Sequence, residues 1–151
     1  MMRVGRKSSI AVGLLLLGVL GATLIAGCAG SGVKTPGSAP AQIIGDITPK
    51  EAYALIQDNK GNADFVIIDV RTPEEVAAGY IAGAINRNSA SGTFREDLDR
   101  LDKNRTYLVY CRSGARSARA VGIMAELGFR EIYNMLGGIG GWQGEGFPVV
   151  K

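Results

Sequence analysis

Histidine is absent from this 151-residue chain, and cysteine occurs only twice. Without histidine there is no Cys–His dyad, no Ser–His–Asp triad and no His-ligated metal. The two cysteines, Cys28 and Cys111, are too few for a disulfide framework or a structural zinc site. A nucleophile in this protein therefore has to be activated by groups other than imidazole or a His-ligated metal ion.

The chain also has little excess charge once its first residues are set aside. It carries 17 basic and 14 acidic residues, and the basic residues Arg3, Arg6 and Lys7 lie among the first ten. Residues 28–151 therefore hold 14 basic and 14 acidic residues, so the net charge of +3 belongs to the leader. The net charge is therefore no argument for a nucleic-acid partner, and none is expected.

Residues 1–27 have the layout of a signal peptide, with a basic start followed by the apolar run 10–26. The end of this leader, Ile25-Ala26-Gly27-Cys28, resembles the bacterial lipobox. The resemblance implies cleavage before Cys28, lipidation of Cys28, and an exported lipoprotein anchored in the membrane on the periplasmic side of the cell envelope. The alternative is an uncleaved membrane anchor, for which the run is short. Residues 28–42 are expected to comprise the lipidated Cys28 and a flexible tether rich in Gly, Ser, Pro and Ala.

Residues 43–151 predict one α/β domain with a central, mostly parallel β-sheet flanked by helices. Short apolar segments, typical of strands buried on both faces, alternate with capped helical segments. Trp142 is expected to fill the core. The expected strands are 65–69, 84–86, 106–110 and 131–135, and the expected helices are 48–57, 72–79, 94–101, 117–127 and a weak one around Trp142.

The segment 106–127 carries the strongest chemical signal. Cys111 follows an apolar strand and precedes a helix, so its thiol faces the unpaired N–H groups and the positive dipole end of that helix. No acidic residue lies between Asp102 and Glu126, but five basic residues do: Lys103, Arg105, Arg112, Arg116 and Arg119. We therefore interpret Cys111 as a nucleophile that attacks an anionic substrate, and not as an ordinary buried cysteine.

The residues after Cys111 are suited to holding an anion. Backbone amides of the loop can form an anion-binding nest, Arg112 and Arg116 add positive charge, and Ser113 and Gly114 allow tight curvature. Asp69 also ends a predicted strand, and the carboxyl ends of parallel strands meet at one edge of a sheet, where ligands bind. Asp69 and Cys111 are therefore expected to lie at the same edge.

Four motifs together resemble the rhodanese family of single-domain sulfurtransferases: DVRTPEE at 69–75, AGAIN at 82–86, CRSGARS at 111–117 and GGIGGW at 137–142. They occur in the order found in the family and span about residues 45–150. The resemblance implies a rhodanese-like fold and transfer of a sulfane sulfur through a persulfide on Cys111, without a cofactor. The donor would be a small anion such as thiosulfate, and the acceptor a thiol or cyanide.

The same resemblance implies roles for particular residues. The amides of residues 112–116 would cradle the sulfur, Arg116 would close the loop, and Ser117 would hydrogen-bond toward the sulfur. Asp69 and Arg71 would support the site, and a structural carboxylate–arginine pair is favoured over direct catalysis by Asp69. Tyr80 and Ala82 stand where many relatives have His and Pro. The implied substrate-binding residues are Arg112, Ser113, Gly114, Ala115, Arg116 and Ser117.

Other functions remain open from the sequence. A cysteine phosphatase or arsenate reductase also uses a Cys-loop-Arg cradle, but commonly with five residues between Cys and Arg, whereas four separate Cys111 from Arg116 here. The shorter loop favours a sulfur atom over a phosphate. A non-catalytic rhodanese-like binding module is a second alternative, although the cysteine is present. A thiol redox protein is disfavoured because residues 43–151 hold no second cysteine.

Overall fold

The computed structural model describes residues 41–151. The predicted signal peptide (1–27), the predicted lipidation site Cys28 and the predicted tether as far as residue 40 lie outside the described residues. Within 41–151, none of the helices is both long and apolar enough to cross a membrane.

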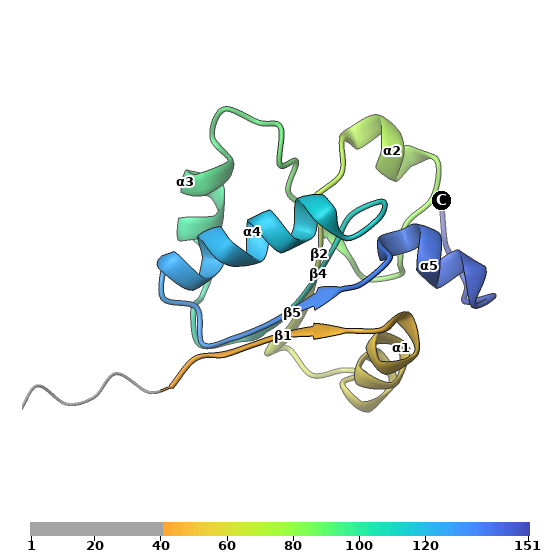
Figure 1. Cartoon of the computed structure of the whole chain (residues 1–151), viewed down its shortest axis with the longest axis horizontal. Coiled ribbons are helices and arrows are strands. Elements are labelled where there is room, and N and C mark those ends of the chain that lie inside the picture. The colour runs from red at the N-terminus through yellow and green to blue at the C-terminus, as the bar shows by residue number, and fades with distance from the viewer. Residues whose placement is uncertain (1–40) are drawn as a thin grey trace, which may run out of the picture. The chain divides into compact units, whose positions relative to one another are not determined.

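A five-stranded, all-parallel sheet forms the centre of the described domain, which confirms the predicted α/β class (Figure 1). The strand order is β1-β5-β4-β2-β3. The strands are β1 (Ile43–Ile47), β2 (Phe65–Asp69), β3 (Ile85–Asn86), β4 (Thr106–Tyr110) and β5 (Glu131–Met135). The helices are α1 (Pro49–Asp58), α2 (Pro73–Ala77), α3 (Phe94–Asp99), α4 (Ala115–Glu126) and α5 (Gly138–Gly144).

Helices cover both faces of the sheet, which explains why its central strands are almost continuously apolar. α3 and α4 pack on one face and α1 and α5 on the other (Figure 1). Along β4 the side chains alternate between the two layers, with Tyr107 and Val109 on the α4 side and Leu108 and Tyr110 on the α5 side. Trp142 is 2% exposed in the second layer, as predicted.

Two capping boxes begin α1 and α2, as their sequences predict. Thr48 and Glu51 exchange hydrogen bonds at the start of α1, and Thr72 and Glu75 do so at the start of α2. Each box satisfies N–H groups that the first helical turn leaves unpaired, and proline stands at the start of each helix. The second box also fixes the position of Glu75, which bears on the site described below.

One strand was not expected, and several boundaries differ from the sequence-based expectation; α2 ends at Ala77 and not at residue 79, and β3 begins at Ile85 and not at residue 84. No strand was expected at 43–47. Gly45 and Asp46 are poor strand formers, yet β1 forms there by pairing with β5. α3 ends at Asp99 and not at residue 101. α4 begins at Ala115, two residues before the expected start, with Gly114 as its N-cap. Gln42, expected to end the tether, hydrogen-bonds to the carbonyl oxygens of Ala125 and Phe129.

Candidate active site

Cys111 lies at the carboxyl edge of the sheet, directly after β4 and before the first turn of α4. It continues the alternation of Tyr107 and Val109 and so belongs to the layer of side chains beneath α4. Only 1% of the residue is exposed. The thiol therefore sits at the base of the short connection between β4 and α4, almost out of contact with bulk water.

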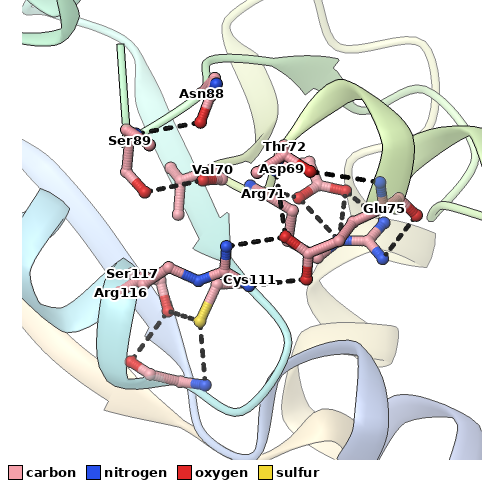
Figure 2. A network of polar contacts seen from close by, with 12 residues as sticks. Asp69, Val70, Arg71, Thr72, Glu75, Asn88, Ser89, Cys111, Arg116 and Ser117 are labelled. Atoms are coloured by element: carbon pink, nitrogen blue, oxygen red, sulfur yellow. Dashed lines mark hydrogen bonds and ion pairs between the residues drawn. The ribbon is translucent and has the colours of Figure 1, made fainter. Parts of the chain in front are cut away.

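The backbone of this connection points a hydrogen-bond donor at the sulfur. The Gly114 N–H donates to the Cys111 Sγ over 3.1 Å. The Ser117 hydroxyl lies 3.6 Å from the same sulfur (Figure 2). Gly114 has a φ of +97°, a left-handed conformation that glycine adopts without strain. The structure thus brings together Cys111, Gly114 and Ser117, three of the residues predicted from the sequence.

Burial and hydrogen bonding act in opposite directions on the thiol. Burial raises the pKa of Cys111, because a thiolate is poorly solvated in the domain interior. Hydrogen bonds from the Ser117 side chain and from the backbone N–H groups of Ser117, Ser113 and Gly114 lower that pKa. The hydrogen bonds outweigh the burial, so the net pKa of the thiol lies below its ordinary value. Cys111 therefore has the electrostatic character of a nucleophile.

The first turn of α5 donates hydrogen bonds to two carbonyl groups of the loop. The Ile139 N–H donates to the carbonyl oxygen of Cys111 over 2.8 Å, and the Gly140 N–H donates to that of Arg112 over 3.0 Å. Because peptide groups are planar, fixing these carbonyls also fixes the N–H groups that follow them. The motif at 137–142 was identified from the sequence without a role. In the structure, its backbone N–H groups fix the position of the loop that follows β4.

Arg116 is paired with a carboxylate from another element. Its guanidinium makes two hydrogen bonds of 2.7 Å to the Glu75 carboxylate at the start of α2 (Figure 2). The hydrogen bond with Arg116 is the main reason that the pKa of Glu75 falls to about 2. The segment around Arg116 has no acidic residue in sequence, but the fold supplies one. Part of the positive charge expected at the loop is therefore neutralised.

Arg112 and Ser113 are exposed on the loop, and Ala115 is exposed at the start of α4. Ala115 and Arg116 belong to the helix and not to the loop. The predicted set 112–117 is thus contiguous in space, but its members face different ways: Gly114 and Ser117 face the sulfur, and Arg116 faces Glu75.

Asp69 and Arg71 form a buried ion pair, with 2.6 Å between Asp69 Oδ2 and Arg71 Nη2. Arg71 also donates to the carbonyl oxygens of Glu75 and Gly79, at 3.1 and 2.7 Å. The structural pairing favoured by the sequence is thus present, and it holds the segment that carries Glu75.

Tyr80, which stands where many relatives have histidine, takes part in a short antiparallel bridge. Its N–H and C=O groups both pair with Val150, at 2.9 Å each. Among residues 41–151, no group of three or more His, Cys, Asp or Glu side chains is placed to hold a metal ion.

The fold and the site define a parallel α/β domain with a buried, amide-stabilised thiol between a central strand and a helix. The sequence model of the family described as "Rhodanese-like domain" matches residues 48–145. The chain therefore belongs to the family of rhodanese-like domains.

Individual relatives agree with this assignment. A sulfurtransferase of Allochromatium vinosum is 33% identical over 100 residues, which cover 66% of this chain and 92% of that protein. The thiosulfate sulfurtransferase GlpE of Actinobacillus succinogenes is 31% identical, over 69% of this chain and 88% of that protein. The crystal structure of a rhodanese-related protein from Thermoplasma volcanium superposes with a TM-score of 0.60, at 35% identity, over 70% of this chain and 96% of that one.

Other relatives carry the domain within longer proteins. A tRNA uridine(34) hydroxylase of Picosynechococcus is 38% identical over 62% of this chain, but the match covers 31% of that protein. The shared part is thus the rhodanese-like domain alone.

Proposed function

We propose that this protein is a sulfurtransferase that moves a sulfane sulfur from a small anionic donor, such as thiosulfate, to a thiophilic acceptor through a persulfide on Cys111. The observation that carries the proposal is the Gly114 N–H aimed at the Cys111 sulfur from the head of α4. The thiosulfate sulfurtransferase GlpE of Actinobacillus succinogenes supports the choice of donor.

The reaction is a double displacement. The Cys111 thiolate attacks the outer sulfur of thiosulfate, the S–S bond of the donor breaks, and sulfite leaves with the bonding electron pair. The outer sulfur is now bound to Cys111 as a persulfide. A thiolate or cyanide then attacks that sulfur, the new S–S bond breaks, and Cys111 is regenerated as a thiolate. The sequence of steps needs no external oxidant or reductant.

The chain's own residues assist both displacements. The Gly114 N–H and the Ser117 hydroxyl stabilise negative charge on the sulfur, as donors that are fixed before the reaction begins. Arg112, exposed on the loop, is proposed to attract the anionic donor. Arg116 is positively charged, but its ion pair with Glu75 weakens the positive potential that it produces at the sulfur. Its proposed role is to close the loop and to add this weakened potential.

The site is poorly equipped for phosphate-ester hydrolysis. A cysteine phosphatase needs a carboxylic acid that protonates the leaving group. Glu75 is the carboxylate paired with Arg116, and its pKa of about 2 means that it carries no proton at neutral pH. The deep burial of Cys111 likewise favours a slim donor over an aryl phosphate.

Mass spectrometry of the full-length protein after incubation with thiosulfate tests the proposal. We expect one added sulfur atom on the peptide that contains Cys111, its removal by cyanide, and no such adduct in Cys111→Ser. A protein that gains no sulfur at any pH would be a binding module and not a transferase. Faster hydrolysis of an aryl phosphate than consumption of thiosulfate would favour the phosphatase alternative.

We also propose that the protein is an exported lipoprotein, anchored through Cys28 and facing the periplasmic side of the envelope. The lipobox-like end of the leader, Ile25-Ala26-Gly27-Cys28, supports this. Labelling of producing cells with a radioactive fatty acid should mark the wild-type protein and leave Cys28→Ser unlabelled, with Cys111→Ser as the control that keeps the label. Equal labelling of Cys28→Ser would contradict the proposal.

A further inference from the structure

The Ser117 hydroxyl has one proton to donate but three hydrogen-bond acceptors around it. Its Oγ lies 2.6 Å from Asn134 Oδ1, 3.0 Å from the carbonyl oxygen of Gly114 and 3.6 Å from Cys111 Sγ. A hydroxyl has one proton and can fully serve one of these acceptors at a time. The shortest contact is the one to Asn134, a residue that the predicted site did not include.

The orientation of the Asn134 amide is determined by Asp46. The Asn134 Nδ2 donates to Asp46 Oδ1 over 2.8 Å, and an ionised carboxylate can only accept. The NH₂ end of the amide therefore faces Asp46, and its carbonyl end faces Ser117. Since an amide carbonyl can only accept, the short contact of 2.6 Å requires Ser117 to donate its proton to Asn134.

The sheet places these groups in a row beneath α4. Asp46 on β1 is opposite Asn134 on β5, and Asn134 is opposite Val109 on β4, two residues before Cys111. Asn134 is 3% exposed and Ser117 is fully buried, whereas Asp46 is exposed. Asp46 and Asn134 both line a surface hollow of about 360 Å³ between β1 and α4. Asp46, Asn134 and Ser117 thus form a chain of polar contacts from this hollow inward to the Cys111 sulfur.

We propose that Asn134, oriented by Asp46, competes with the Cys111 sulfur for the Ser117 hydroxyl proton and so restrains the reactivity of the thiol. When the sulfur is a neutral thiol, the proton points to Asn134. When the sulfur carries negative charge, it becomes the stronger acceptor and the hydroxyl turns toward it. Asn134 and Asp46 are positioning residues, since both act through Ser117. This inference rests on the proposed function only in taking Cys111 as the reacting thiol.

The rate at which iodoacetamide alkylates Cys111 in the full-length protein tests this proposal. The rate is followed by mass spectrometry of the Cys111 peptide, so that Cys28 does not contribute. The readout needs no sulfur donor, and a failure of sulfur transfer would leave it intact. Arg116 of α4, whose charge interacts with the sulfur, and its partner Glu75 of α2 are unchanged in every variant.

Freeing the hydroxyl should make the thiol more reactive. In Asp46→Ala the amide of Asn134 loses the partner that orients it. In Asn134→Leu the nearest competing acceptor is removed, and the more distant Gly114 carbonyl oxygen remains. At a pH well below the thiol pKa we expect both variants to be alkylated about three- to tenfold faster than the wild type, the effect of strengthening one hydrogen bond to a charged acceptor. Ser117→Ala should be alkylated more slowly, because it lacks the donor altogether.

Double variants separate this mechanism from a simple charge effect. Removing the Asp46 carboxylate also removes a negative charge, and a pure charge effect would speed alkylation whether or not Ser117 is present. In a Ser117→Ala background the hydroxyl is gone, so Asp46→Ala and Asn134→Leu should each change the rate by less than the margin of the assay. Asp58→Ala, which removes an exposed carboxylate on α1, should also leave the rate unchanged.

An acceleration that persists without Ser117 would overturn the proposal in favour of a charge effect. Slower alkylation of Asn134→Leu would also overturn the proposal, because it would mean that Asn134 supports the hydrogen bond from Ser117 to the sulfur. Asn134 is buried, so circular dichroism of its variant shows whether the domain is folded. The exposed Asp46→Ala variant provides the same test without a change in the core.

Discussion

Gly138 of α5 packs against the backbone of Arg112 so closely that a Cβ atom at position 138 would lie 2.6 Å from the Arg112 carbonyl carbon. Gly138 also has a φ of +55°, in the left-handed region. A bare backbone at this position therefore lets the amides of residues 139 and 140 reach the loop carbonyls at 2.8 and 3.0 Å. The geometry around Cys111 depends on this contact between two backbones.

Gly138→Ala should disrupt the loop. The added methyl group meets backbone atoms that cannot rotate aside, and alanine disfavours a positive φ, so we expect unfolding to become easier by at least about 2 kcal/mol. Persulfide formation should be lost with it. Chemical denaturation and thiosulfate labelling measure the two effects. The matched control is Gly144→Ala at the other end of α5, where a Cβ would meet nothing within 4 Å and no such loss is expected.

Glu75→Gln should release the charge of Arg116 toward the loop. Glutamine preserves the capping box with Thr72 but cannot form an ion pair. We expect a lower KM for thiosulfate and a lower Cys111 pKa, together with a loss of stability of about 1 kcal/mol at neutral pH. Steady-state kinetics and alkylation profiles test this. A higher KM would mean that Glu75 serves to position Arg116. Glu74→Gln, in the same helical turn, should behave as the wild type.

The Glu75–Arg116 pair should also contribute to the stability of the protein in acid. The pKa of Glu75 is lowered from 4.5 to about 2 in the folded state, so the folded state binds this proton less readily than the unfolded state. The contribution is complete above about pH 5 and is lost as the pH falls toward 2. Denaturation midpoints measured from pH 7 to pH 2 should therefore fall more steeply for the wild type than for Glu75→Gln. Parallel curves would contradict this prediction.

Arg71→Ala should be among the most destabilising single substitutions in the domain. It leaves the Asp69 carboxylate buried without its partner and removes two hydrogen bonds that hold the segment before β3, for an expected loss of about 3–5 kcal/mol. Urea denaturation measures it. Arg95→Ala breaks an ion pair of similar length, 2.9 Å to Glu126, but both side chains are more than half exposed, so almost no loss is expected.

The pH profile of Cys111 alkylation should have its midpoint below that of free cysteine, because the hydrogen bonds to the sulfur lower its pKa more than burial raises it. The same chain in concentrated urea is the matched control, since unfolding removes the cradle and should return the midpoint to the ordinary range. A folded protein whose midpoint equals or exceeds the unfolded one would show that burial dominates.

Most of the secondary structure could be predicted from the sequence because its signals are local. The apolar runs of β2, β4 and β5, and the Thr-Pro-x-Glu starts of α1 and α2, lie within a few residues of the structure that they specify. Cys111 could be singled out in the same way, from its place between a strand and a helix. β1 was missed because Gly45 and Asp46 weaken its pattern, and its pairing with β5, nearly ninety residues away, is what makes it a strand.

The sequence by itself determined the α/β class and the family resemblance, and it singled out Cys111 as the proposed nucleophile, since each of these depends on neighbouring residues or on motifs in a given order. Only the tertiary structure decided what surrounds the thiol. It paired Arg116 with Glu75, placed Gly138 against the loop, and brought Asn134 and Asp46 beneath Ser117. These contacts join residues between 17 and 88 positions apart, and sheet register and helix packing set them in ways that no local pattern encodes.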